Sequence, residues 1–167
     1  MIEVTANLWD FHAKGHHVVV TTNIGWAPGN PWNNMGAGMA LQAAYRYPEL
    51  PGWYGRRCRE YGAGTPVLKR DDLGLVFLPV KPLLEENPGA SWNQTASLEL
   101  IARGLDQLLA WVTTRKAKVA MGLPGAGNGR LDPVEVLGLV RDKLGFRRGI
   151  VLADWRLGRL VGGSTRR

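Results

Sequence analysis

The sequence of 167 residues has a single cysteine, only three histidines and no long apolar run. One cysteine cannot form an intramolecular disulfide, which fits a protein that works in a reducing cytoplasm. Cys58 lies in a helical pattern with no spacing to a histidine that would activate it, so we interpret it as a packed or half-exposed residue rather than a nucleophile. His12, His16 and His17 lack the spacing of metal ligands, and we expect no metal and no other cofactor.

No stretch of about 18 consecutive apolar residues is present, so the sequence predicts no transmembrane helix. The first residues also lack a basic segment followed by an apolar one, and we expect neither membrane insertion nor export through a signal peptide. The length predicts one domain with a sizeable core. We place this domain at residues 1–160 and expect a flexible basic tail at residues 161–167.

The net charge of +7 is concentrated near the C-terminus. The segment 141–167 has eight basic and two acidic residues, a net charge of +6. The basic residues are Arg141, Lys143, Arg147, Arg148, Arg156, Arg159, Arg166 and Arg167. Such a cluster indicates either a surface that faces nucleic acid or a solvated arginine-rich face, and we favour the second interpretation.

Two glycine-rich turns are the most informative feature of the sequence, each after an apolar run and before a helical pattern. The first is Met35–Gln42 (MGAGMALQ) and the second is Gly122–Asp132 (GLPGAGNGRLD). Glycines let backbone N–H groups approach an anion closely, and a helix N-terminus adds about half a positive charge. Two such turns indicate a ligand held at two places, as a diphosphate-bearing nucleotide would be, unless both are ordinary turns.

Neither turn completes the signature of a kinase or a dehydrogenase. No Gly-Lys-Ser/Thr follows the glycines of the second turn, so it is not a Walker A loop. No acidic residue stands about 20 positions beyond either turn at the end of a strand, as the dinucleotide-binding fingerprint requires. Both classes of nucleotide-binding enzyme are therefore excluded.

Apolar strand patterns alternate with amphipathic helical patterns along the chain. We expect strands at residues 2–4, 17–22, 66–69, 74–80, 118–121 and 149–153, and helices at 36–47, 53–61, 98–112 and 133–144. Two loops, Trp26–Asn34 and Pro82–Trp92, interrupt this order. The alternation predicts an α/β fold, a three-layer α/β/α sandwich with a mixed central sheet.

Four stretches, taken in order, resemble the macro domain, an α/β fold that binds ADP-ribose. The likeness is strongest to the branch that includes bacterial DNA ADP-ribosyl glycohydrolase antitoxins. The stretches are Ala6–Leu8; Thr22–Gly25 with Met35–Gln42 and Tyr47–Glu49; Phe77–Lys81 with Trp92 and Leu98–Leu105; and Leu123–Asp132. Ala6, Val80 and Arg130 depart from the family pattern, which has Gly, Thr and Gly there. Trp26–Asn34 looks like an insertion that would form a lid or partly fill the site.

The resemblance implies a set of ligand-binding residues and a catalytic pair. The ligand-binding set is Asn7, Leu8, Gly36, Ala37, Gly38, Met39, Gly125, Ala126, Gly127, Asn128 and Gly129. Asn23 is implied to approach the distal ribose, and Lys81 to be catalytic. Because Pro82 holds Lys81 extended at the end of a strand, a partly desolvated Lys81 amine would lose its proton more easily and attack the anomeric carbon. The alternative is a Lys81 that pairs with an acid or neutralises phosphate.

The resemblance implies a glycohydrolase that removes ADP-ribose from a macromolecule, nucleic acid among the candidates, or a phosphatase that acts on ADP-ribose 1″-phosphate. The second hypothesis is a reader that binds ADP-ribose without turnover. The third is a nucleic-acid-binding module that uses the basic C-terminal region, with the glycine turns merely structural. Only turnover needs Lys81, so this residue separates the first hypothesis from the second.

Overall fold

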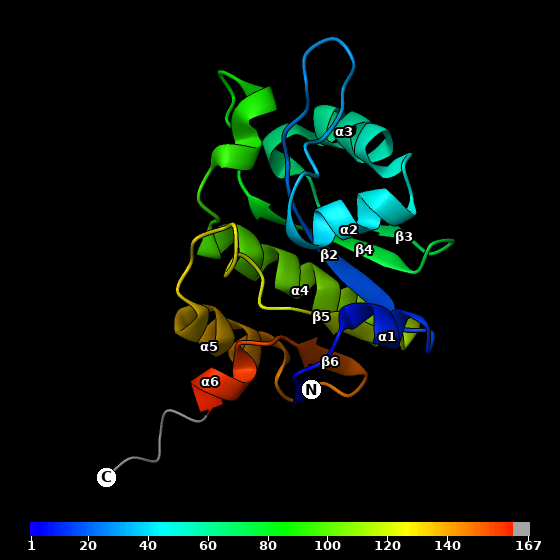
Figure 1. The fold of residues 1–167 in the computed structure, drawn as a ribbon, viewed down its shortest axis with the longest axis vertical. Coiled ribbons are helices and arrows are strands. Elements are labelled where there is room, and N and C mark those ends of the chain that lie inside the picture. Colours follow the sequence, from blue (N-terminus) through cyan, green and yellow to red (C-terminus); the bar gives the residue numbers. More distant parts are fainter. Residues whose placement is uncertain (162–167) are drawn as a thin grey trace.

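A computed structural model of the chain describes residues 1–161, in which a mixed sheet of six strands lies between two layers of helices (Figure 1). The strand order is β1-β6-β5-β2-β4-β3. Neighbouring strands are parallel except that β3 runs antiparallel to β4. The strands are β1 (Ile2–Val4), β2 (His17–Asn23), β3 (Leu68–Arg70), β4 (Leu75–Lys81), β5 (Val119–Met121) and β6 (Ile150–Ala153). The predicted fold class is confirmed.

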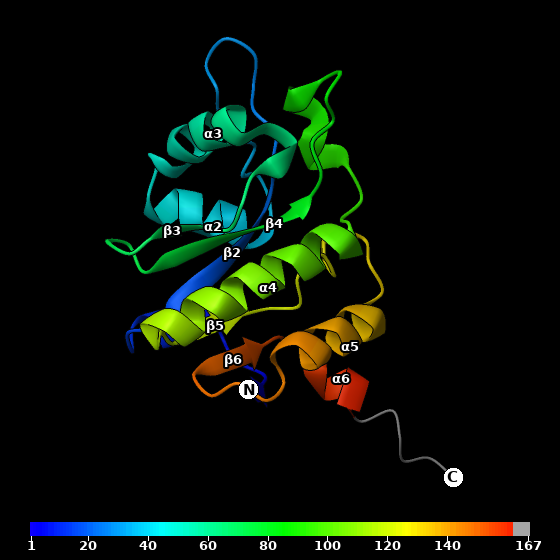
Figure 2. The same ribbon diagram turned by 180° about the vertical axis from the view of Figure 1, so that it is seen from behind.

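The helices cover both faces of the sheet (Figure 2). They are α1 (Leu8–His12), α2 (Gly38–Arg46), α3 (Leu50–Tyr61), α4 (Leu98–Arg115), α5 (Pro133–Leu144) and α6 (Leu157–Val161), with the 3-10 turns η1 (Gly62–Gly64) and η2 (Pro88–Asn93). On one face α4 and α5 bury Val19, Val76 and Leu78. On the other, α1, α2 and α3 bury Val20 and Phe77. Burial on both faces explains the apolar runs Val18–Val20 of β2 and Leu75–Val80 of β4.

Side-chain caps fix where the two helices of the first face begin. The Ser97 hydroxyl accepts a hydrogen bond from the Leu100 N–H at the start of α4, and the Asp132 carboxylate accepts one from the Val134 N–H at the start of α5. On the opposite face Cys58 is fully buried, and burial raises the pKa of its thiol to about 12. This confirms Cys58 as a packed residue.

Two short helices were not expected from the sequence. Asn7 begins α1, because its side-chain oxygen accepts a hydrogen bond from the Trp9 N–H at 3.0 Å. Both α1 and α6 have only five residues, too few to show a helical period. Val161 ends α6, and the remainder of the predicted tail, 162–167, lies outside the described residues. Within residues 1–161, no helix has the length and hydropathy needed to cross a membrane.

The segment Trp26–Asn34 packs against α3 and η2. It rises past α3 at the top of Figure 1. A Cβ on Gly55 of α3 would collide with the backbone of residues 31–33. A Cβ on Gly25, just before the segment, would collide with Pro88 and Ser91 of η2. The expected insertion is therefore a docked loop, whose backbone lies directly on a helix.

We predict that Gly55→Ala lowers the free energy of unfolding by about 1–3 kcal/mol, because the added methyl group pushes against backbone that cannot rotate away. The matched control is Gly52→Ala on the same helix, where a Cβ would lie 3.4 Å from the Arg56 Nη1, an ordinary contact. Urea unfolding of both variants measures the difference. Equal stabilities would show that the loop does not depend on contact with α3.

Candidate functional site

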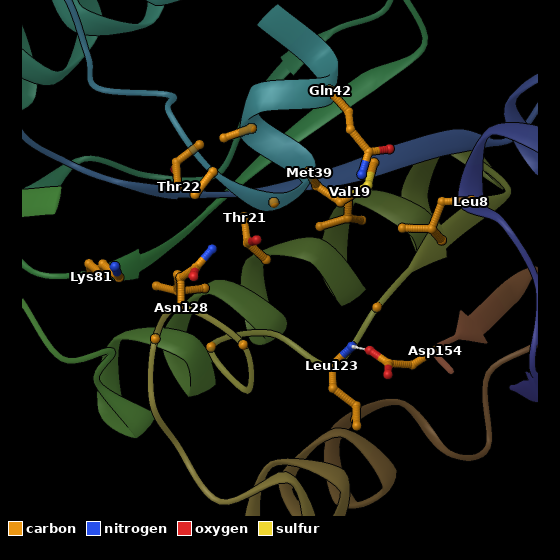
Figure 3. A pocket seen from close by; sticks show the side chains of 18 of the residues that line it. Leu8, Val19, Thr21, Thr22, Met39, Gln42, Lys81, Leu123, Asn128 and Asp154 are labelled. Carbon is orange, nitrogen blue, oxygen red and sulfur yellow. Dashed lines mark hydrogen bonds between the residues drawn. The ribbon is translucent and has the colours of Figure 1, made fainter. Parts of the chain in front are cut away.

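A cleft of about 960 Å³ lies where β2, β4, β5 and β6 end. Parallel strands present their carboxyl ends at one edge of a sheet, which is where α/β folds place their ligands. Both glycine turns line this cleft, as does the start of α1. Figure 3 shows Lys81 at one end of the cleft and Leu8 at the other.

All but one of the residues expected at the site line the cleft. Those that line it are Asn7, Leu8, Asn23, Gly36, Ala37, Gly38, Met39, Lys81, Gly125, Gly127, Asn128 and Gly129. The exception is Ala126, which packs against the core beneath α4 and α5 instead. Of the loop Trp26–Asn34, only Asn34 lines the cleft, so this loop does not fill it.

The second glycine turn presents unused backbone donors to the cleft. Within residues 1–161, the N–H groups of Gly125, Gly127, Asn128 and Gly129 donate no hydrogen bond. A buried amide without a partner is costly, whereas one that faces a cleft is free to bind an anion. The turn is thus a row of donors ready for a phosphate.

The N-terminus of α2 faces this turn across the cleft. Ala37 precedes the helix and has no side-chain acceptor, so the first N–H groups of α2 are not capped. Uncapped N–H groups and the helix dipole both favour an anion at this end. The start of α2 and the second glycine turn lie close together: a Cβ on Gly38 would be 3.7 Å from the Asn128 Nδ2.

The glycines of the second turn have different structural requirements. Gly125 has a φ of +75°, and a Cβ there would press on Ala96 and Ile101. A Cβ on Gly129 would lie 2.7 Å from the Gly125 Cα. At Gly127 the φ is not in the left-handed region, and a Cβ would meet only the end of the Arg156 side chain, at 3.1 Å. The fold therefore requires Gly125 and Gly129 but leaves Gly127 free to vary.

Lys81 is the last residue of β4, and its ammonium nitrogen donates a hydrogen bond to the Trp92 carbonyl of η2 at 2.6 Å. Partial burial and the nearby positive charge of Arg130 both lower the pKa of Lys81 below its ordinary value, burial being the larger cause. Asn23 of β2 is its register partner. The structure therefore brings the expected catalytic pair together.

The Asn23 side chain holds its own loop in place. Its Oδ1 accepts from the Gly25 N–H at 2.9 Å and from the Asn33 amide at 3.0 Å, and its Nδ2 donates to the Asn34 carbonyl at 2.9 Å. Asn33 is 1% exposed and also donates to the carbonyls of Asn23 and Gly25. The polar atoms of Asn23 thus serve the loop, and at most one N–H of its amide remains for a ligand.

Asp154 is a cleft residue that the sequence reasoning missed. It follows β6 and is 7% exposed. Its Oδ2 accepts a hydrogen bond from the Leu123 N–H at 3.0 Å, drawn in Figure 3, and pairs with the Arg156 guanidinium at 2.8 Å. Asp154 therefore fixes the start of the second glycine turn. Its signal was a polar residue directly after a buried strand, the same signal that singled out Asn23.

Ion pairs engage several members of the basic C-terminal cluster. Arg141 pairs with Glu3 at 2.7 Å, Lys143 pairs with Asp106 at 2.9 Å, and Arg156 is held by Asp154. Paired charges attract a polyanion less than free ones do. Within the described part of the cluster, the structure therefore agrees better with a paired, solvated face than with a nucleic-acid surface.

No protein-family model matches the chain, and no curated protein matches it in sequence. Solved structures do match. The macrodomain of Mycobacterium tuberculosis DarG superimposes with a TM-score of 0.70 over 92% of this chain and 95% of that one, at 24% identity. The chain has the macrodomain fold.

Two further structures share this macrodomain fold. The macrodomain of Thermus aquaticus DarG matches with a TM-score of 0.68 at 23% identity, over 92% of this chain and 97% of that one. Thermosipho africanus DarTG, solved in complex with ADP-ribose, matches with a TM-score of 0.68 at 20% identity, over 90% of this chain and 40% of that one. The resemblance drawn from four sequence stretches is thus confirmed as a likeness of fold.

We predict that Asn33→Ala lowers the free energy of unfolding by about 1–3 kcal/mol, because the substitution leaves the buried Asn23 and Gly25 oxygens with fewer donors. Asn30→Ala is the matched control, since Asn30 is exposed in the same loop and its side chain makes no hydrogen bond within residues 1–161. Thermal unfolding followed by circular dichroism measures both. A tolerated Asn33→Ala would show that the amide network contributes little.

Proposed function

We propose that the cleft binds ADP-ribose, with the diphosphate between the second glycine turn and the N-terminus of α2. The observation that carries this proposal is that the second glycine turn and the start of α2 both line the cleft and both have backbone N–H groups without a hydrogen-bond partner within residues 1–161. A diphosphate bridges two such surfaces, because its negative charges lie at the centre of the molecule. The presence of ADP-ribose in the Thermosipho africanus relative supports the same ligand class.

The two ends of the cleft differ in a way that orients this ligand. Asn7 and Leu8 lie at one end, together with Gln42, whose side chain accepts a hydrogen bond from the Trp9 indole at 2.8 Å. We assign the adenosine to this end. Lys81 lies at the opposite end, where the distal ribose would place its anomeric carbon.

We predict that Gly127→Val weakens ADP-ribose binding by at least about tenfold, which corresponds to about 1.4 kcal/mol. The side chain would occupy the space of a phosphate and push Arg156 aside, while the backbone at this position accepts any residue. Isothermal titration calorimetry measures the affinity. Gly138→Val on α5 is the control, since a Cβ there meets nothing within 4 Å. Unchanged affinity in a folded Gly127→Val protein would refute the placement of the diphosphate.

For catalysis, we propose that the chain is an ADP-ribosyl glycohydrolase with Lys81 as nucleophile. The neutral Lys81 amine forms a bond to the anomeric carbon while the bond from that carbon to the leaving group breaks, and the leaving group takes the electron pair. The alkylated nitrogen then releases one proton, which neutralises the leaving group. Water attacks the anomeric carbon: its OH goes to the sugar, its other hydrogen goes to the lysine nitrogen, and the bond from that nitrogen to the carbon breaks to restore the neutral amine. The lowered pKa of Lys81 makes the neutral form more accessible.

A reader that binds without turnover is the second candidate, and one contact favours it. The Lys81 ammonium group donates to the Trp92 carbonyl at 2.6 Å. A hydrogen bond to a carbonyl oxygen stabilises the charged form of the amine, which is not nucleophilic. In that case Lys81 would bind the distal ribose and do no chemistry.

Turnover by the Lys81 variants separates these two candidates. Arginine stays protonated, so we predict that Lys81→Arg and Lys81→Ala both lose about 10²-fold or more in kcat. The substrates are ADP-ribosylated DNA and ADP-ribosylated protein, with ADP-ribose titrations run in parallel. Wild-type turnover in both variants would exclude the nucleophile. Binding without any turnover by the wild type would establish the reader.

The pH dependence gives a second measurement of the same step. Because only the neutral Lys81 amine attacks, we predict that kcat rises with pH through the Lys81 pKa. Burial and Arg130 lower this pKa, so the rise falls at lower pH than for an ordinary lysine. A kcat that is flat with pH over this range would contradict the role of the amine.

The proposal also includes the macromolecule to which the ADP-ribosyl group is attached. We propose nucleic acid as the carrier on the net charge of +7 alone. The ion pairs of Arg141, Lys143 and Arg156 weaken this argument, which is why ADP-ribosylated protein is tested beside ADP-ribosylated DNA. The competing hypothesis, a plain nucleic-acid-binding module, requires salt-dependent binding of unmodified DNA or RNA and no affinity for ADP-ribose. The calorimetric titration above decides against it if ADP-ribose binds.

A further inference from the structure

At one end of the cleft, the side chains of Lys81 and Arg130 donate hydrogen bonds to the backbone carbonyls of two consecutive residues. Lys81 donates to the Trp92 carbonyl at 2.6 Å, and Arg130 of the second glycine turn donates from Nη2 to the Asn93 carbonyl at 2.7 Å. Trp92 and Asn93 are the last two residues of η2. One short turn therefore holds both cations at the same end of the cleft.

No carboxylate neutralises this pair within residues 1–161. Neither side chain takes part in an ion pair, and the hydrogen bonds that hold them end on backbone carbonyls. The other guanidinium N–H groups of Arg130 make no hydrogen bond within this range. Two neighbouring cations without a counter-ion in a cleft attract an anion strongly.

The backbone at Arg130 is unusual as well. Its φ is +63°, a conformation that favours glycine, yet an arginine stands there. Such a conformation costs free energy and persists where the surrounding structure enforces it, commonly at ligand sites. Two hydrogen bonds hold the residue: its N–H donates to the Gly127 carbonyl at 3.0 Å, and its side chain reaches η2.

We propose that Arg130 interacts with the negative charge that the group attached to the distal ribose carries, as a phosphate does, or develops as the bond breaks, as a carboxylate ester does. Arg130 would thereby select linkages whose leaving group departs as an anion. This inference rests on the proposed function, because it takes the distal ribose to lie at Lys81. Arginine cannot lose its proton in a protein, so Arg130 keeps its charge while Lys81 becomes neutral to react. Arg130 would therefore bind the anion, and Lys81 would attack the anomeric carbon.

The chemistry of the bond-breaking step explains the selection. When the bond to the anomeric carbon breaks, the leaving oxygen takes the electron pair and becomes negative. A fixed guanidinium beside this oxygen stabilises the developing charge. A leaving guanidine or amine has to depart protonated, and a second cation beside it would repel it. Linkages to arginine side chains are therefore disfavoured.

The first experiment compares the affinities of ADP-ribose and ADP-ribose 1″-phosphate by calorimetry at low temperature, with chromatography to confirm that the phosphate ester is intact. We expect the wild type to bind ADP-ribose 1″-phosphate at least about tenfold more tightly than ADP-ribose, a difference of about 1.4 kcal/mol. The ratio of the two affinities should fall below about threefold in Arg130→Gln. It should fall equally in Arg130→Gly, a second variant that suits the left-handed backbone and so preserves the fold.

The matched control is Arg148→Gln, which removes the same charge from an exposed residue outside the cleft. The control should keep the wild-type ratio, and Arg130→Lys should keep part of it. An equal affinity for both ligands in the wild type, or the same ratio in Arg130→Gln as in the wild type, would overturn the anion site alone. If neither ligand binds, the proposed function itself fails.

The second experiment compares turnover of glutamate-linked and arginine-linked ADP-ribosyl peptides. We expect kcat/KM for the glutamate ester to exceed that for the arginine linkage by at least about tenfold, and Arg130→Gln to lower the first value and not the second. Equal cleavage of both peptides by the wild type would contradict the selection. Loss of both activities in Arg130→Gln would likewise overturn it, since a residue needed for every linkage does not discriminate among them.

Discussion

Burial of β2 and β4 on both faces is the constraint on which the site depends. A strand covered by helices above and below is mostly apolar along its length, and amide and charged side chains stand at its end. Asn23 and Lys81 are these end residues, and they are register partners. Asp154 stands in the same position after β6. The two helical layers therefore decide where the chemistry of the molecule lies.

The short turn η2 joins parts of the molecule that are far apart in sequence. Gly25 packs against Pro88 and Ser91 of this turn, while the carbonyls of its last two residues accept hydrogen bonds from Lys81 and Arg130. The Asn23–Asn33 network fixes Gly25, and so supports η2 from the other side. A change in the loop between β2 and α2 would thus reach Lys81 through contacts, although only Asn34 of that loop lines the cleft.

The sequence predicted the fold and the cleft well because both follow from local patterns. Apolar runs gave the strands, and glycines gave the turns at their ends. Residue roles that depend on tertiary packing could not be predicted from the sequence. Ala126 lies within a glycine turn but packs against the core. The side-chain amide of Asn23 forms hydrogen bonds mainly with its own loop. The anchoring of Arg130 to η2 needed the tertiary contact between two loops 37 residues apart.

The different constraints on the three glycines of the second turn matter for reading related sequences. Gly125 and Gly129 are demanded by neighbouring atoms, so a protein that had lost all affinity for a nucleotide would still have to retain them. Gly127 is under no such demand. Its replacement by a bulky residue in another chain would therefore report the loss of a ligand, whereas the presence of the outer two reports only the geometry of the turn.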